Sequence, residues 1–347
     1  MTDITIRTSG RVGRITLNRP HALNALTWGM IDTLSRALPD LAADDAITML
    51  VIDAEGDRAF CAGGDIAELY HALTVNDYDT PRRFWREEYA LNKALFEFPK
   101  PVASFLQGYT MGGGVGLGCH ASHRIVCENS TLSMPECAIG FVPDVGGSLL
   151  LARAPGRLGE YLGTTGARMS AADAILAGFA DYFIPQHTWP DLIASLEDTG
   201  DWALIDGAAQ PAPTAPLAAQ LTDINTHFGG ETLRDILNSL DHTPDDWAKS
   251  ARAKLNRNAP LAVAATVDLI HRVRALDRIT DALSLEYRFA HRAAAQGDLR
   301  EGIRAAIIDK DKSPNWQHPS PDAPSSAEVS AMLMPLGPDE LILEDPS

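Results

Sequence analysis

Short apolar segments alternate with amphipathic segments through the first half of the chain. The segments Ile4–Thr8 and Val12–Asn18 flank Ser9-Gly10 and predict a β-hairpin. From Thr27 onward, apolar residues recur at spacings of three and four, which predicts an amphipathic helix with Thr27 as its N-cap. Three further segments are short and rich in apolar or β-branched residues, and we predict that they are buried strands: Ile47–Ala54, Val102–Gly108 and His123–Glu128. Strands that are separated by helices indicate a layered α/β fold with right-handed crossovers.

The second half has a helical pattern. No strand is predicted after Asp181–Pro185, and Asp206–Ala219 contains three prolines, which is typical of a linker. Helices are predicted at about 231–240, 244–256, 260–274 and 280–308. The segment 313–347 has no Lys or Arg and is rich in proline and acids. We therefore predict an α/β core in 1–205, a helical region in 206–312 and an irregular acidic tail in 313–347.

Composition and charge exclude several classes of protein. Hydrophobic residues make up 45% and charged residues 22% of the 347, as in ordinary globular domains. The net charge of −17 repels nucleic acids and anionic membranes, so we expect neither as a partner. Four cysteines are too few for a disulfide scaffold. The sequence begins without a recognisable secretion signal and has no apolar run of membrane-spanning length, so we predict a cytoplasmic protein.

Three glycine-containing segments are candidates for chemistry: Ala59–Ile66, Gly108–Gly118 and Met134–Gly147. The second follows a predicted strand and opens a predicted helix. Its first N–H groups lack partners within the helix, so they are suited to bind an anion or a developing oxyanion. The first segment has Gly63 and Gly64, which free one more N–H. A thioester carbonyl needs two donors, and the two loops could supply one each. The alternatives are an ordinary surface turn and a tight crossover without a ligand.

The third segment places Glu136 and Asp144 in an otherwise apolar stretch. Carboxylates are costly to bury, and burial raises the carboxyl pKa, which makes the group a better base. A capping Glu and an Asp-containing turn would explain the same spacing. Glu88 is next to another acid on a predicted helix, and such pairs usually form a solvated face.

Other patterns have weaker support. Gly116–Ala121 fits the G-x-G-x-x-A dinucleotide pattern, which is frequent by chance. The Cys and His residues between 119 and 137 lack the paired spacing of a metal site, so no metal is expected. No G-x-S-x-G motif is present, which leaves a serine hydrolase without support.

Taken together, the segments Asn18–Leu26, Ala59–Ile66 and Gly108–Gly118 resemble the crotonase (enoyl-CoA hydratase/isomerase) superfamily in order and spacing. The resemblance implies a ββα spiral core with two roughly perpendicular sheets and a helical C-terminal region. It also implies acyl-CoA binding, with the thioester oxygen held between the N–H groups of Gly64 and Gly113. Neighbouring positions in the same loops would then contact the substrate: Ala62, Gly63, Asp65 and Gly112.

A closer resemblance is to the 3-hydroxyisobutyryl-CoA hydrolases, which act in valine catabolism. It is carried by Arg86–Asn92, Thr110–Gly118, Met134–Gly147 and Gly302–Trp316. It implies that Glu136 and Asp144 are catalytic and that Glu88 contacts the substrate.

Two positions depart from the wider superfamily. Hydratases carry a first glutamate where this chain has Gly116, which makes hydration doubtful. Many relatives carry a Lys where this chain has His21, so Arg19 and Arg58 are the candidate contacts to CoA phosphates.

The resemblance thus implies hydrolysis of 3-hydroxyisobutyryl-CoA to 3-hydroxyisobutyrate and CoA, with no cofactor beyond the CoA of the substrate. Superfamily members often form trimers or hexamers, so a homo-oligomer is also consistent with it. The alternatives are a hydratase or isomerase of the same superfamily, a catalytically silent acyl-CoA-binding protein, and a nucleotide-dependent oxidoreductase.

Overall fold

The computed structural model describes residues 2–343 of the chain. These residues form two compact units that are interleaved along the sequence. Unit 1 consists of the chain up to Gly64 together with Ala90–Ser133 and Arg168–Ala218, and unit 2 consists of Asp65–Tyr89, Met134–Ala167 and the chain from Ala219. The helix α3 (Asp79–Phe96) is divided between them after Tyr89. This division differs from the predicted boundary near 205, because segments distant in sequence pack into each unit.

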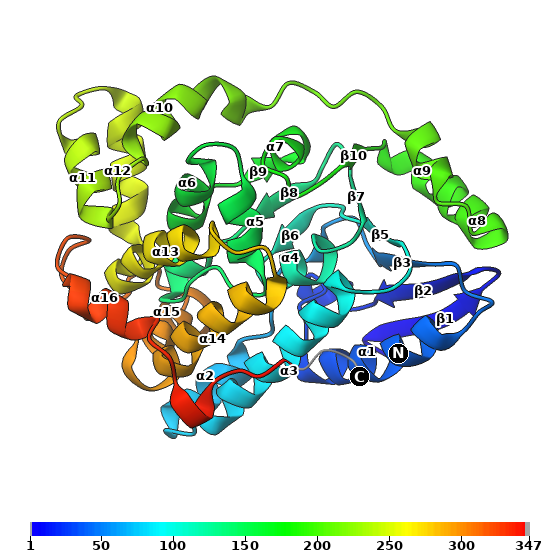
Figure 1. Cartoon of the computed structure of the whole chain (residues 1–347), viewed down its shortest axis with the longest axis horizontal. Helices are drawn as coiled ribbons and strands as arrows, with labels where there is room; N and C mark the ends of the chain where they lie inside the picture. Colours follow the sequence, from blue (N-terminus) through cyan, green and yellow to red (C-terminus); the bar gives the residue numbers. More distant parts are fainter. Residues whose placement is uncertain (1, 344–347) are drawn as a thin grey trace. The chain divides into compact units, whose positions relative to one another are not determined.

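Unit 1 contains a six-stranded sheet in the order β1-β2-β3-β5-β7-β10. Its strands are β1 (Ile4–Ser9), β2 (Val12–Leu17), β3 (Met49–Ala54), β5 (Val102–Phe105), β7 (His123–Val126) and β10 (Tyr182–Phe183). β1 and β2 form the predicted antiparallel hairpin, and the strands from β2 to β10 pair in parallel. Figure 1 shows β1, β2 and β3 side by side.

A second sheet of unit 1 has four strands in the order β4-β6-β8-β9. They are β4 (Ala59–Cys61), β6 (Tyr109–Met111), β8 (Thr131–Ser133) and β9 (Met169–Ser170). β4, β6 and β8 are parallel, and each has only three residues. Two of the glycine segments therefore follow strands of this small sheet rather than the longer strands predicted before them.

Helices complete unit 1. They are α1 (Trp28–Ala43), α4 (Gly113–Gly118), α7 (Ala171–Leu176), α8 (Trp189–Thr199) and α9 (Ala203–Ala208), with the last part of α3. The prediction for α1 is confirmed, since the Thr27 side chain accepts a hydrogen bond from the N–H of Met30. A buried cluster joins Met49, Val51 and Phe105 of the large sheet to Trp189 and Leu196 of α8.

Unit 2 is helical. Its helices are α2 (Ala67–Thr74), the first part of α3, α5 (Gly147–Arg153), α6 (Leu158–Thr165), α10 (Leu221–His227), α11 (Leu233–Asp241), α12 (Asp246–Arg257), α13 (Pro260–Val273), α14 (Ile279–Gln296), α15 (Leu299–Ile303) and α16 (Ser326–Met332). A 3-10 turn, η2, covers Glu136–Ile139, and a π-helical turn, η5, covers Arg304–Ile308. The predicted helix 280–308 is thus broken at Gly297.

The segment predicted to be an irregular tail contains α16. The Ser325 side chain caps this helix by accepting the N–H of Glu328, and the Glu328 carboxylate accepts the backbone N–H of Ser325. Arg288 of α14 forms an ion pair with Glu340 at 2.6 Å, and Arg292 donates to the carbonyls of Met332 and Met334. The segment has no Lys or Arg of its own, and arginines of α14 supply positive charges that hold it.

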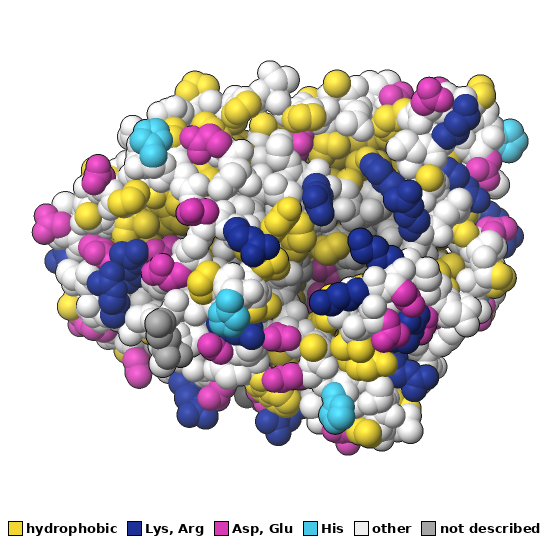
Figure 2. Space-filling model, turned by 180° about the vertical axis from the view of Figure 1, so that it is seen from behind, with side chains coloured by type: hydrophobic (Ala, Val, Ile, Leu, Met, Phe, Trp, Pro, Cys, Tyr) yellow, Lys and Arg dark blue, Asp and Glu magenta, His cyan; other side chains and the backbone are white. Residues whose placement is uncertain are grey.

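Within residues 2–343, no helix is both long enough and apolar enough to cross a membrane. Basic side chains are mixed with acidic ones over the face of the molecule in Figure 2.

Candidate active site

The first glycine turn of unit 1 follows β4. The N–H of Ala62 donates to the carbonyl of Leu23 at 3.0 Å, and the N–H of Leu26 donates to the carbonyl of Gly63 at 2.9 Å. Gly63 has φ +111°, a value that side chains rarely allow. These bonds leave the N–H of Gly64 without a hydrogen-bond acceptor among the described residues.

The second glycine turn joins β6 to α4. Gly112 has φ +50° and is the N-cap, and Gly113 is the first residue of the helix. The carbonyl of Gly112 accepts hydrogen bonds from the N–H groups of Val115 and Gly116. The N–H of Gly113 has no acceptor in the part of the chain that the structure describes. This matches the prediction that the segment opens a helix with an unpaired donor.

The two turns lie against each other. A Cβ atom built on Gly63 would be 4.0 Å from the nitrogen of Gly113 and 3.3 Å from the carbonyl oxygen of Met111. A Cβ atom on Gly114 would be only 2.1 Å from the carbonyl oxygen of Cys61. The absence of side chains lets the two turns approach, so the two unpaired N–H groups belong to turns in close contact. Such an arrangement can bind an oxyanion through peptide dipoles.

The two arginines predicted to contact CoA phosphates differ in their surroundings. Arg19 donates to the carbonyl of Ala25 at 2.6 Å and forms an ion pair with Asp3 at 3.5 Å. Arg58 is exposed and lines a pocket of about 270 Å³ with Pro20 and Asn24. Arg58 is therefore the more available of the two.

Three predicted carboxyl groups of unit 2 are buried: Glu88 of α3, Glu136 of η2, and Asp144 between η2 and α5. Burial raises the pKa of Glu88 well above its usual value, and the charge of Asp144 raises it further. Burial likewise raises the pKa of Glu136, with a further increase from Asp144. Burial raises the pKa of Asp144 to about 7. The structure thus brings the three together, and the solvated face expected for Glu88 from its sequence neighbours is wrong.

Tyr89 holds one oxygen of Asp144. Its hydroxyl donates to Oδ2 at 2.8 Å, and this bond lowers the pKa of Asp144 against the larger effect of burial. Tyr89 is fully buried and follows Glu88 directly on α3. Two consecutive residues of α3 are therefore linked to Asp144: the charge of Asp144 raises the pKa of Glu88, and Tyr89 donates a hydrogen bond to Asp144.

Glu136 differs from Asp144 in its hydrogen bonds. Its Oε2 atom is buried and has no hydrogen-bond partner among the described residues. A buried polar atom without a partner is rare in native proteins, and such atoms occur at sites of catalysis or strain. A water molecule or a substrate atom would satisfy this oxygen, and the raised pKa makes the ionised carboxylate a stronger base.

Glu286 of α14 is a fourth buried carboxyl group in unit 2. It accepts hydrogen bonds from the backbone N–H groups of Gly146 and Ser148, at 2.8 and 3.1 Å. Burial raises its pKa to about 8, although the donors from Ser148 and Gly146 lower it.

Sequence reasoning missed both Glu286 and Tyr89. A signal for Glu286 was present, because its neighbours three and four positions away on the helix are all buried and apolar: Ala282, Leu283, Phe289 and Ala290. A single acidic residue on an otherwise apolar helix face indicates a buried carboxyl group with a functional or structural role.

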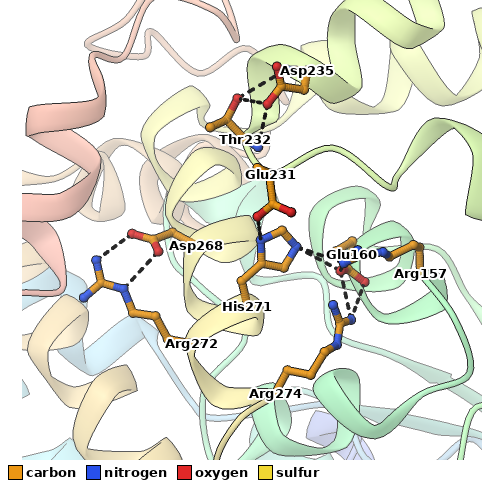
Figure 3. A network of polar contacts seen from close by, with 9 residues as sticks. All are labelled: Arg157, Glu160, Glu231, Thr232, Asp235, Asp268, His271, Arg272 and Arg274. Carbon is orange, nitrogen blue, oxygen red and sulfur yellow. Dashed lines mark hydrogen bonds and ion pairs between the residues drawn. The ribbon is translucent and has the colours of Figure 1, made fainter.

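Unit 2 also contains a buried carboxyl group of a different kind. Glu160 of α6 is fully buried and contacts Arg157 at 2.9 Å, His271 at 3.0 Å and Arg274 at 2.9 Å (Figure 3). Burial opposes its ionisation, but the hydrogen bonds from His271 and Arg157 outweigh that effect and lower the pKa of Glu160 to about 2. We call these four residues the Glu160 network. It connects the start of α6 to the end of α13.

The remaining predicted contact, Asp65, is partly exposed and precedes α2. The four cysteines are buried, and none of them forms a disulfide within residues 2–343. Within residues 2–343, no group of three or more His, Cys, Asp or Glu side chains is arranged to hold a metal ion.

A family model described as enoyl-CoA hydratase/isomerase matches residues 12–333. This chain therefore belongs to the enoyl-CoA hydratase/isomerase family, as its motifs suggested.

Individual relatives carry different names. The chain is 35% identical to "3-hydroxyisobutyryl-CoA hydrolase, mitochondrial" of Xenopus laevis, over 96% of this chain and 89% of the relative. A crystal structure described as an enoyl-CoA hydratase from Rhodobacter sphaeroides 2.4.1 is 53% identical, with a TM-score of 0.95 over 98% of this chain and all of the other. One described as a carnitinyl-CoA dehydratase from Mycobacterium thermoresistibile is 37% identical, with a TM-score of 0.94 over the whole of both chains.

Proposed function

We propose that this protein hydrolyses the thioester of 3-hydroxyisobutyryl-CoA, giving 3-hydroxyisobutyrate and CoA. The observation that carries the proposal is the carboxyl group of Glu136, which is buried, has a raised pKa and keeps one oxygen unpartnered. The hydrolase names of relatives at about one third identity, which extend over most of the chain, support the substrate.

The N–H groups of Gly64 and Gly113 have the role of the oxyanion hole. In the tetrahedral intermediate, the thioester oxygen becomes negative, and these two donors stabilise it. Gly113 adds the favourable potential at the start of α4. Because the dipoles of the two peptide groups stabilise the negative charge of the oxyanion, we expect no metal or redox cofactor.

Glu136 serves the attack on the carbonyl carbon by one of two routes. As a general base, it takes a proton from water, the hydroxide attacks, the C–S bond breaks, and the CoA thiolate receives a proton. As a nucleophile, its carboxylate attacks directly to form an anhydride, which water then hydrolyses. A single turnover in ¹⁸O-labelled water separates the routes, because only the anhydride route can leave ¹⁸O in the Glu136 side chain.

The other site residues recognise the substrate. Asp144 binds the 3-hydroxyl group or assists proton transfer, and Glu88 lines the acyl pocket. The glycine turns contribute contacts to the thioester through Ala62, Gly63, Asp65 and Gly112. Arg58, and to a lesser extent Arg19, contact the phosphates of CoA.

Hydration of an enoyl-CoA is the second candidate. The name of the relative that is 53% identical favours it. The hydratase pattern uses two glutamates, however, and Gly116 occupies the first position here. An isomerase needs only one carboxylate, so Gly116 at this position does not argue against isomerase activity.

One experiment tests the proposal against its alternatives. The purified protein is mixed with 3-hydroxyisobutyryl-CoA while free thiol is measured, and in parallel with crotonyl-CoA while the enoyl absorbance is followed. We expect thiol release and a slow or undetectable loss of crotonyl absorbance. Loss of the enoyl absorbance without thiol release would identify a hydratase. Saturable binding with neither reaction would identify a silent acyl-CoA-binding protein.

A further inference from the structure

The turn that carries Asp144 has an unusual backbone. Val145 is buried and has φ +54°, and Gly146 has φ +77°. A β-branched residue at positive φ is an outlier and persists only where surrounding contacts hold it.

Glu286 supplies those contacts from α14. Its Oε2 accepts the N–H of Gly146, and its Oε1 accepts both the N–H and the hydroxyl of Ser148. These donors lie at the start of α5, where backbone N–H groups have no partners within the helix. Three donors thus bind the one buried carboxyl group of Glu286. They belong to Gly146 and Ser148, which precede Glu286 by 140 and 138 residues in the sequence.

We propose that Glu286 is a positioning residue, which fixes the turn from Asp144 to Ser148 so that the Asp144 carboxyl group is presented in one orientation. Tyr89 holds that carboxyl group directly, whereas Glu286 acts on the backbone that follows it. The inference rests on the proposed function, in which Asp144 binds the 3-hydroxyl of the substrate.

The chemistry of the contact requires a carboxyl group. Both oxygens of Glu286 accept a backbone N–H, one each. A glutamine has one acceptor oxygen, and its NH₂ group would face one of the two N–H donors. Glu286→Gln therefore breaks part of this contact with almost no change in volume.

Glu286 also acts through its charge. It shares its surroundings with Asp144, with Glu136 of η2, and with Glu88 and Tyr89 of α3. Its negative charge raises the pKa of Glu136. The pKa of Glu286 is about 8, so this charge is fully present only above that pH. Glu286→Gln should consequently lower the pKa of Glu136 in that range, which loss of folding stability alone would not do.

The test compares Glu286→Gln and Ser148→Ala with the wild type, and uses Glu160→Gln as the matched control. The control makes the same substitution at another fully buried glutamate of unit 2. For Glu286→Gln we expect kcat on 3-hydroxyisobutyryl-CoA to fall about 10-fold while KM changes less than about 3-fold, because misplacement of a reacting group affects the rate more than binding. Ser148→Ala removes only the hydroxyl bond and should cost about 5-fold. Glu160→Gln should leave kcat and the pH profile unchanged below its unfolding temperature.

Backbone hydrogen exchange gives a readout that does not depend on the reaction. We expect the amides of Gly146 and Ser148 to exchange at least about 10-fold faster in Glu286→Gln, since their acceptor is weakened. Unchanged exchange at both amides together with a wild-type kcat would overturn the proposal.

The outcomes also separate this inference from the proposed function. If the wild type hydrates crotonyl-CoA and releases no thiol, the proposed function fails, and the variants are compared on hydration. If the wild type catalyses neither reaction, exchange at the two amides decides whether Glu286 holds the turn. If Glu286→Gln does not fold, Ser148→Ala is measured by kcat and by exchange at both amides, because it removes one of the three donors to Glu286 and should weaken its hold on the turn in part.

Discussion

Unit 2 contains two sets of buried carboxyl groups, and they compensate for burial in opposite ways. Glu160 is surrounded by Arg157, His271 and Arg274, so it stays ionised and its pKa is about 2. The set formed by Glu88, Glu136, Asp144 and Glu286 faces hydroxyl groups, backbone N–H groups and other carboxyls, and the pKa of each member is raised.

The difference distinguishes a structural charge from a reactive one. A carboxylate that is fully paired with cations holds elements together but has little tendency to exchange a proton. A carboxyl group that lacks cations can gain or lose a proton near neutral pH, at the expense of folding stability. The proposed function accordingly uses the second set, and the following predictions test that proposal.

The largest effect is expected for Glu136→Gln. Removal of the ionisable group should lower the rate of thiol release about 1,000-fold, because general base or nucleophilic action is lost while shape is kept. Binding of a CoA ester, measured by calorimetry, should change little. A turnover rate near that of the wild type would remove Glu136 from the chemistry.

Gly113→Pro tests whether the N–H of Gly113 stabilises the negative oxygen of the tetrahedral intermediate, for which the proposed mechanism uses no cation. Proline is tolerated at the first position of a helix, so the substitution removes the N–H while preserving α4. We expect the rate of thiol release to fall about 100- to 1,000-fold. Circular dichroism and the unfolding temperature check the fold. Full activity in a folded variant would exclude this N–H from the oxyanion hole.

Asp144→Asn should change selectivity. Loss of the charged partner of the 3-hydroxyl should lower kcat/KM for 3-hydroxyisobutyryl-CoA about 10- to 100-fold more than for isobutyryl-CoA. Rates on the two thioesters, measured side by side, give the comparison. An equal loss on both would show that Asp144 does not recognise the hydroxyl.

The smallest effects concern stability, and their signs should be opposite for the two sets. The folded-state pKa of Glu160 lies below its usual 4.5, so its stabilisation is present above that pH and is lost as the pH falls toward 2. Glu160→Gln should lower the free energy of unfolding by about 2–3 kcal/mol at pH 7 and by much less near pH 3.

Asp144 has a folded-state pKa of about 7, above its usual 3.8, so its contribution becomes unfavourable as the pH rises between those values. Asp144→Asn should therefore raise the free energy of unfolding on the order of 1–3 kcal/mol at pH 8 relative to pH 4. Denaturant titrations at several pH values measure both variants. Parallel pH dependences in the two variants would remove the contrast between the two sets.

Local patterns predicted the parts of the fold that depend on neighbours in sequence. The β1–β2 hairpin and α1 with its Thr27 cap followed from periodicity and turn residues. The three-residue strands β4 and β8 are too short to show a period of two. The helix α16 was missed because composition reflects only its own residues, whereas Arg288 and Arg292 of α14 stabilise the segment around it.

The candidate site shows the same limit. Glu136 and Asp144 were noticed because they interrupt an apolar stretch, and the two glycine turns because of their composition. Gly63 and Gly113 approach each other through turns that are about fifty residues apart, which the pairing of β4 with β6 explains. The contact of Glu286 with Gly146 spans 140 residues and depends on tertiary packing alone.

The interleaving of the two units bears on how the chain is synthesised. The backbone passes from one unit to the other five times, after Gly64, Tyr89, Ser133, Ala167 and Ala218. Unit 1 can therefore be completed only after residue 218 has been synthesised. Unit 2 can be completed only when nearly the entire chain has been synthesised. No single cut yields either unit as one continuous fragment, so nascent chains of intermediate length expose surfaces that chaperones are suited to shield.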